Sequence, residues 1–71
     1  MRGNSVYGAR ERTQADKAND CFAFIFNARP AALMAMTAER LCADKGVTNR
    51  QARREIEVRL LAAQDRERRR A

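Results

Sequence analysis

Three arginines that stand close together, Arg50, Arg53 and Arg54, are the side chains of this sequence with the clearest chemistry. A guanidinium group stays charged in proteins, binds any phosphate, and can donate two hydrogen bonds to the O6 and N7 atoms of guanine. A second group of arginines follows near the end of the chain, and its members are Arg66, Arg68, Arg69 and Arg70. We predict that both groups bind nucleic acid, the second through the sugar-phosphate backbone alone.

The residue types on which catalysis and metal binding usually depend are scarce in this chain. It contains no histidine and no glycine-rich phosphate loop, and its carboxylates stand beside arginines, where ion pairing accounts for them. The two cysteines, Cys21 and Cys42, lack the spacing of a zinc-binding pair. We therefore expect a protein that is not an enzyme and has no cofactor or metal ion, with both cysteines as buried free thiols.

The chain is short and strongly basic. Its 71 residues leave room for one domain with a small core, and a second copy would add buried surface, so a homodimer is one expectation. The formal net charge is +6, and residues 47–71 contribute +4 of it, with eight basic and four acidic side chains. This excess favours an acidic partner such as nucleic acid or an acidic protein surface. No apolar run is long enough to cross a membrane and no signal peptide is evident, so we expect no membrane association and a cytoplasmic location.

From Ala9 the sequence favours a helix that ends near Asn27. At about 100° per residue, one side of this helix would carry Ala15, Ala18, Phe22, Ile25 and Phe26. Phe24 would lie on the opposite side. The three phenylalanines also alternate with the period of a strand, so a strand at residues 21–27 stays open as an alternative.

A second helix is predicted for residues 31–44. Pro30 suits its first turn, Asn27 is a possible cap, and alanine, leucine and methionine are strong helix formers. Apolar side chains surround most of its circumference, which is typical of a central helix. The residues expected in the core are Leu33, Met34, Met36, Leu41 and Cys42. The two methionines could instead form an adaptable surface for a partner. Gly46 ends this helix, because glycine readily adopts the left-handed conformation that follows a last turn.

A third helix begins after Gly46 and extends almost to the C-terminus, which makes it roughly 30 Å long at 1.5 Å per residue. We expect Thr48 to cap its first turn and Gln51, three residues on, to complete a capping box. Val47 and Ala52 would pack together on either side of this cap.

The third helix would bury one face and expose the other. Its buried stripe should consist of Ala52, Ile56, Leu60 and Ala63. Val58 and Leu61 face away from this stripe, and with Phe24 they are expected to contact a partner protein or a second copy of the chain. With Ala52 pointing inward, Arg50 and Arg54 also lie on the outer face, and Arg53 lies at its edge.

These elements predict an all-α fold in a single domain. A small three-helix domain would occupy residues 9–64, after a flexible arm at 1–8 and before a basic charged tail at 65–71. A ribbon-helix-helix arrangement, with a strand at residues 22–26 as in small dimeric repressors, is the minority alternative.

Residues 40–60, R-L-C-A-D-K-G-V-T-N-R-Q-A-R-R-E-I-E-V-R-L, join the second and third predicted helices through a tight turn. The segment resembles the helix-turn-helix of bacterial repressors, in which a G-V-S or G-V-T turn leads into an arginine-rich recognition helix. The matching residues are Gly46, Val47, Thr48, Arg53, Arg54, Glu55 and Ile56. The resemblance implies a DNA-binding protein whose third helix enters the major groove and places its first residues at base edges.

Two functions fit these features. The first is that of a small non-enzymatic transcription regulator that binds nucleic acid through the arginine-rich helix. The second is that of an effector of the phage or plasmid kind, which docks on a host protein machine such as RNA polymerase and modulates its activity. A basic surface fits both, because it attracts an acidic protein groove as it attracts nucleic acid.

Overall fold

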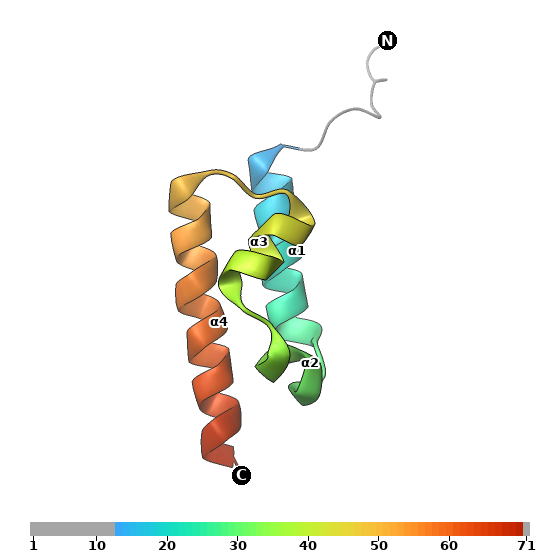
Figure 1. Ribbon diagram of the computed structural model, residues 1–71, viewed down its shortest axis with the longest axis vertical. Coiled ribbons are helices and arrows are strands. Elements are labelled where there is room, and N and C mark those ends of the chain that lie inside the picture. Colours follow the sequence, from blue (N-terminus) through green and yellow to red (C-terminus); the bar gives the residue numbers. More distant parts are fainter. Residues whose placement is uncertain (1–12, 71) are drawn as a thin grey trace.

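The structure, a computed structural model, describes residues 13–70, and all of its regular elements are helices (Figure 1). The helices are α1 (Gln14–Asn27), α2 (Pro30–Ala35), α3 (Ala38–Lys45) and α4 (Arg50–Arg70). No strand forms within residues 13–70, so the predicted all-α fold is confirmed. Over the same residues, no helix is both long enough and apolar enough to cross a membrane. The predicted arm at residues 1–8 lies outside the described part of the chain.

Helices α1 and α4 lie side by side and run in the same direction along the length of the molecule (Figure 1). Helix α2 turns the chain round at the C-terminal end of α1 and packs on α4. Helix α3 then carries the chain back toward the start of α1 and contacts both α1 and α4. The turn that leads into α4 therefore lies next to the first turn of α1, at one end of the molecule.

Helix α1 includes the segment for which a strand was the alternative. Thr13 caps it in a capping box: the Asp16 N–H donates to Thr13 Oγ1 at 3.1 Å, and the Thr13 N–H donates to the Asp16 carboxylate at 3.4 Å. The helix therefore begins later than the predicted Ala9. It continues through the three phenylalanines to Asn27, so the ribbon-helix-helix alternative is wrong. Asn27 ends α1 and does not cap α2, whose first turn holds Pro30 as predicted.

The buried face of α1 is rotated from the predicted one. Cys21 is fully buried at its centre, while Phe26, which was predicted to face the core, is 88% exposed. Phe24, which was predicted to point outward, is half-buried and packs against the core. At 100° per residue, Phe24 lies roughly 60° from Cys21 and Phe26 roughly 140° from it. The reason is that α1 packs on α3 as well as α4, and Cys21 Sγ donates to the Leu41 carbonyl of α3 at 3.8 Å.

The predicted helix over residues 31–44 is two helices, α2 and α3. The chain is extended at Met36, with φ −87° and ψ 147°, and Thr37 then caps α3 by accepting a backbone hydrogen bond at 3.1 Å. Gln64 of α4 holds this break, because its Nε2 donates to the carbonyls of Leu33 at 2.9 Å and Met36 at 2.8 Å. Gln64 is buried, and the predicted stripe of α4 did not include it.

A small apolar core lies between α1, α3 and α4. Its buried cluster consists of Ala18, Cys21, Leu41, Cys42, Val47 and Ile56. The predicted core residues that are confirmed are Leu33, Leu41, Cys42, Ile56 and Leu60. Met36 is half-buried and packs against the edge of this cluster, whereas Met34, which was also predicted in the core, is exposed. Both cysteines are buried free thiols, as predicted, and burial beside Cys42 raises the pKa of Cys21 to about 11.

Candidate nucleic-acid interface

The turn between α3 and α4 contains the left-handed glycine that the sequence predicts. Gly46 has a φ of +80°, and its N–H donates to the Ala43 carbonyl at 3.3 Å. The Val47 N–H donates to the Cys42 carbonyl at 2.9 Å, and the Val47 side chain is buried. These hydrogen bonds satisfy the last carbonyls of α3 and fix the direction in which the chain leaves it.

The cap of α4 is Asn49 and not the predicted Thr48. Asn49 Oδ1 accepts a hydrogen bond from the Ala52 N–H at 2.9 Å. Asparagine and threonine are both favoured at this position, so local preference alone does not choose between these neighbours. Gln14 of α1 accepts from the N–H groups of both residues, so a contact from outside the turn also holds this backbone. Within the described residues the Gln51 side chain makes no hydrogen bond, so the predicted capping box does not form.

Gln14, in the first turn of α1, holds this turn with its side-chain amide. Its Oε1 accepts from the Thr48 N–H at 2.8 Å and from the Asn49 N–H at 3.0 Å. Its Nε2 donates to the Gly46 carbonyl at 3.2 Å. Sequence analysis missed Gln14, because its three partners lie 32, 34 and 35 residues away and no local pattern marks it. We call this arrangement the Gln14 clamp.

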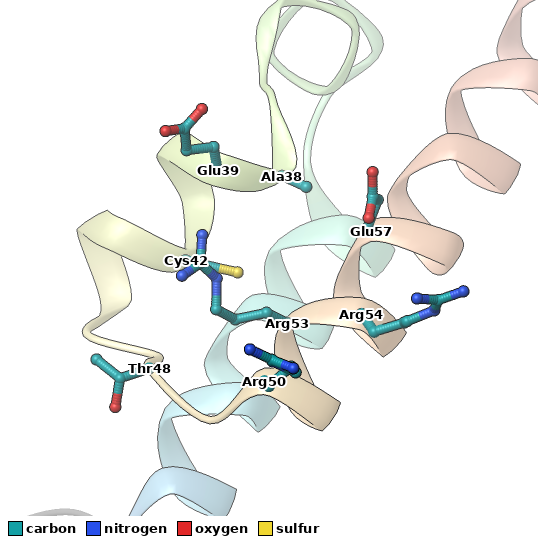
Figure 2. A pocket seen from close by; sticks show the side chains of 8 residues that line it. All are labelled: Ala38, Glu39, Cys42, Thr48, Arg50, Arg53, Arg54 and Glu57. Atoms are coloured by element: carbon teal, nitrogen blue, oxygen red, sulfur yellow. The ribbon is translucent and has the colours of Figure 1, made fainter.

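The first arginine group projects into solvent from the first turns of α4, beside a shallow depression between α3 and α4 (Figure 2). The depression has a volume of about 550 Å³ and is lined by Ala38, Glu39, Cys42, Thr48, Arg50, Arg53, Arg54 and Glu57. Arg53 reaches toward α3, and Arg54 extends to the other side of α4 (Figure 2). All three arginines are exposed and line this depression, although their side chains project in different directions, and we call Arg50, Arg53 and Arg54 together the α4 arginine surface.

The acidic side chains of residues 13–70 do not neutralise the α4 arginine surface. The ion pairs join Arg59 to Glu55 at 2.7 Å, Arg69 to Asp65 at 2.8 Å and Arg70 to Glu67 at 3.5 Å. Glu39 and Glu57 line the depression and form no ion pair with any residue of this described range. The guanidinium groups of this surface therefore keep their donors for an external acceptor. In the same part of the chain, no three potential ligands gather where they could hold a metal ion.

The second arginine group lies at the far end of α4. The helix continues to Arg70, and at 1.5 Å per residue Arg66 is roughly 18 Å along the axis from Arg54. The four arginines of this group point in different directions, because successive residues are rotated by about 100°. Arg69 and Arg70 are paired with acidic neighbours, whereas Arg66 and Arg68 are exposed without an ion pair in the described chain. The structure therefore does not join the two arginine groups into one surface.

Two of the three residues predicted to contact a partner are exposed. Val58 is 57% exposed and Leu61 is 53% exposed, on the face of α4 away from the core. Phe24, by contrast, packs against the core. Sequence analysis missed Phe26, which borders an apolar groove of about 340 Å³ between α1, α2 and α4. The groove is lined by Phe22, Ile25, Phe26, Ala28, Leu33, Arg59, Ala62, Ala63, Arg66 and Glu67.

Comparisons with protein-family models, with curated proteins and with solved structures found no match to this chain. The resemblance to helix-turn-helix regulators therefore depends on the residues of the turn and of α4.

Proposed function

We propose that this protein is a small, non-enzymatic transcription regulator that binds double-stranded DNA through the α4 arginine surface. One observation carries the proposal: Arg50, Arg53 and Arg54 project into solvent from the start of a helix, and no acidic side chain of residues 13–70 pairs with them. Guanidinium groups without an internal partner can bind phosphate and release its counterions without breaking an existing ion pair.

The position of this surface at the start of α4 suits a duplex. The major groove is about 12 Å wide and admits one helix, whose first residues then reach the base edges. The Gln14 clamp ties the start of α4 to α1, so the arginines are presented from a fixed backbone. Single-stranded nucleic acid is usually bound by stacking on aromatic side chains. The described phenylalanines belong to the C-terminal half of α1, away from the α4 arginine surface.

The second arginine group contributes in a different way. Arg66 and Arg68, which have no ion pair within the described residues, add sequence-independent attraction to the phosphate backbone. If the first turns of α4 enter the major groove, its last turns point away from the duplex axis. The second arginine group therefore does not contact base edges.

The apolar groove beside Phe26 favours a second function, that of an effector that binds a host protein machine such as RNA polymerase. Phe26 is 88% exposed, and Arg59 and Arg66 lie among the groove residues. An aromatic anchor beside an apolar groove with basic neighbours fits an acidic amphipathic protein segment. Under this function, Phe26→Ala abolishes partner binding and the α4 arginine surface, Arg50, Arg53 and Arg54, is dispensable.

Titration with random-sequence duplex DNA at two salt concentrations tests the proposal. We expect the logarithm of the binding constant to fall with the logarithm of the salt concentration by about 0.9 for each phosphate contact. Arg53→Ala should lower this slope by about one contact and Arg50→Ala/Arg53→Ala by about two. The matched control is Arg29→Ala, which removes the same charge at the start of α2 and should leave the slope nearly unchanged. If the parent protein does not bind DNA at moderate salt, or if Arg29→Ala weakens binding as Arg53→Ala does, the proposal is wrong.

A further inference from the structure

The face of α4 opposite the core carries two apolar side chains between opposite charges. Its residues, which we call the outer stripe, are Arg54, Val58, Leu61 and Asp65. At 100° per residue, all four lie within about 40° of the point opposite Ile56, which is fully buried, and all four are exposed. Their spacing is four, three and four residues, which is the alternation of a coiled-coil seam.

We infer that the outer stripe pairs with the outer stripe of a second copy of this chain, as two antiparallel α4 helices. A two-fold axis that passes α4 between Arg59 and Leu60 sets Val58 against Leu61 of the second copy. The same axis sets Arg54 against Asp65 of the second copy, and each contact occurs twice because the interface is isologous.

Charge determines the orientation of the two helices. A parallel pair in register sets Arg54 against Arg54 and Asp65 against Asp65, so both ends of the seam repel. In the antiparallel pair, each Arg54 instead lies opposite Asp65 of the second copy, so both ends of the seam attract. Val58 and Leu61 stay within the seam in this orientation. The outer stripe is therefore complementary to itself in one orientation only.

The pairing also buries the exposed apolar side chains of the outer stripe and supplies an ionic partner to its charged ones. Val58 and Leu61 are 57% and 53% exposed, and the seam removes this apolar surface from water. Arg54 has no ion pair in its own copy among residues 13–70. Asp65 accepts from Arg69 through Oδ2 at 2.8 Å, and a carboxylate has sites for a second guanidinium group. Two apolar side chains from each copy make a short seam, so the dimer is weak and forms at high protein concentration.

The proposed dimer forms without nucleic acid, so its dissociation constant is measured with the protein alone. Sedimentation equilibrium of the full chain up to about 1 mM should show a reversible monomer–dimer equilibrium. Arg54→Asp and Asp65→Arg should each raise the dissociation constant about tenfold or more, because each creates two like-charge contacts. The double variant Arg54→Asp/Asp65→Arg should restore it to near the parent value.

This set of variants separates a specific seam from an effect of net charge. Arg54→Asp lowers the net positive charge and Asp65→Arg raises it, so an effect of overall repulsion would move the two dissociation constants in opposite directions. The control Arg40→Asp makes the same charge change on α3, away from the outer stripe, and should not weaken the dimer. The three positions that these variants change, Arg40, Arg54 and Asp65, are all exposed, and circular dichroism checks that each variant stays helical.

Disulfide trapping tests the orientation directly. In the antiparallel pair, position 54 lies opposite position 65 of the second copy, and the two copies of position 54 are roughly 16 Å apart along the axis. A disulfide needs Cα atoms within about 7 Å. A mixture of Arg54→Cys and Asp65→Cys proteins should therefore form a disulfide-linked dimer, and neither protein should do so alone. Cys21 and Cys42 are buried and do not compete. A monomer at every concentration, failure of the double variant to restore association, or cross-linking of Arg54→Cys with itself would each overturn the inference.

Discussion

The Gln14 clamp leads to a prediction about how the turn before α4 is held. Gln14→Ala removes the three hydrogen bonds that join the side-chain amide to the backbone of Gly46, Thr48 and Asn49. Each neutral hydrogen bond contributes about 0.5–1.5 kcal/mol. Thr48 and Asn49 are exposed, so water replaces part of what their N–H groups lose. We therefore expect a loss near the lower end of the summed range, about 2 kcal/mol.

This loss is measurable because the domain is small. For a domain of this size, 1 kcal/mol shifts the melting temperature by about 4–8 °C, so Gln14→Ala should lower it by about 10 °C. The matched control is Asn19→Ala on the same helix, where an exposed side chain without a hydrogen bond in residues 13–70 is removed. Alanine has the higher helix propensity, so Asn19→Ala should be neutral or slightly stabilising.

Hydrogen exchange shows whether the effect is local to the turn. In the parent protein the Thr48 and Asn49 amide protons are held by Gln14 Oε1 and should exchange slowly for exposed positions. In Gln14→Ala both should exchange at rates close to those of an unstructured peptide, while the Ala52 amide, which is bound to Asn49, keeps its protection longer. If Gln14→Ala melts with Asn19→Ala and both amides keep their protection, the clamp contributes nothing and the reasoning is refuted.

Three further predictions concern the core and the turn. Ile56→Ala should cost about 2–5 kcal/mol in the free energy of unfolding, because Ile56 is fully buried, whereas the exposed Val58→Ala should change it little; denaturant titration compares the two. Gly46→Ala should lower the free energy of unfolding by about 1–2 kcal/mol, because alanine disfavours the positive φ of this position. An added Cβ would meet only side-chain atoms at 3.6 Å or more, so no steric clash adds to this cost. A melting temperature equal to that of the parent would contradict this prediction. Burial raises the pKa of Cys21 from 9.0 to about 11, so the folded state holds this proton more tightly than the unfolded state. The resulting stabilisation is complete below pH 9 and is lost as the pH rises toward 11; unfolding titrations at pH 8 and pH 10 should show this decline in the parent and a smaller one in Cys21→Ala.

The turn and the last helix were predictable because their signals are local. Gly46 needs no tertiary contact to favour a left-handed conformation, and it has a φ of +80° as expected. Ile56 and Leu60 repeat with the period of a helix face and are buried. The three arginines of the α4 arginine surface were predictable as exposed for the same reason, since their positions follow from the face that these residues bury.

The features that sequence analysis missed depend on contacts between distant residues. Residues 31–44 favour a helix throughout, and the break at Met36 is stabilised by Gln64, which follows 28 residues later. The register of the α4 cap was wrong by one residue because local preference does not choose between Thr48 and Asn49, and the Gln14 side chain that binds both N–H groups lies 34 and 35 residues away. The face of α1 was misplaced because periodicity identifies a stripe but not how many neighbours cover it. No local preference reports these contacts.

Arg54 belongs to both the α4 arginine surface and the outer stripe, and this overlap makes the two proposals separable. In the antiparallel dimer Arg54 is engaged by Asp65 of the second copy, so Arg50 and Arg53 are the arginines that remain for a duplex. Arg53 lies toward α3, away from the seam, and its removal should weaken DNA binding without changing the dimer (Figure 2). Asp65→Arg should do the reverse: it weakens the dimer and, by adding positive charge and releasing Arg54, strengthens binding to DNA. If Arg53→Ala and Asp65→Arg each change the dimer dissociation constant and the affinity for DNA in parallel, then a single surface controls both self-association and DNA binding.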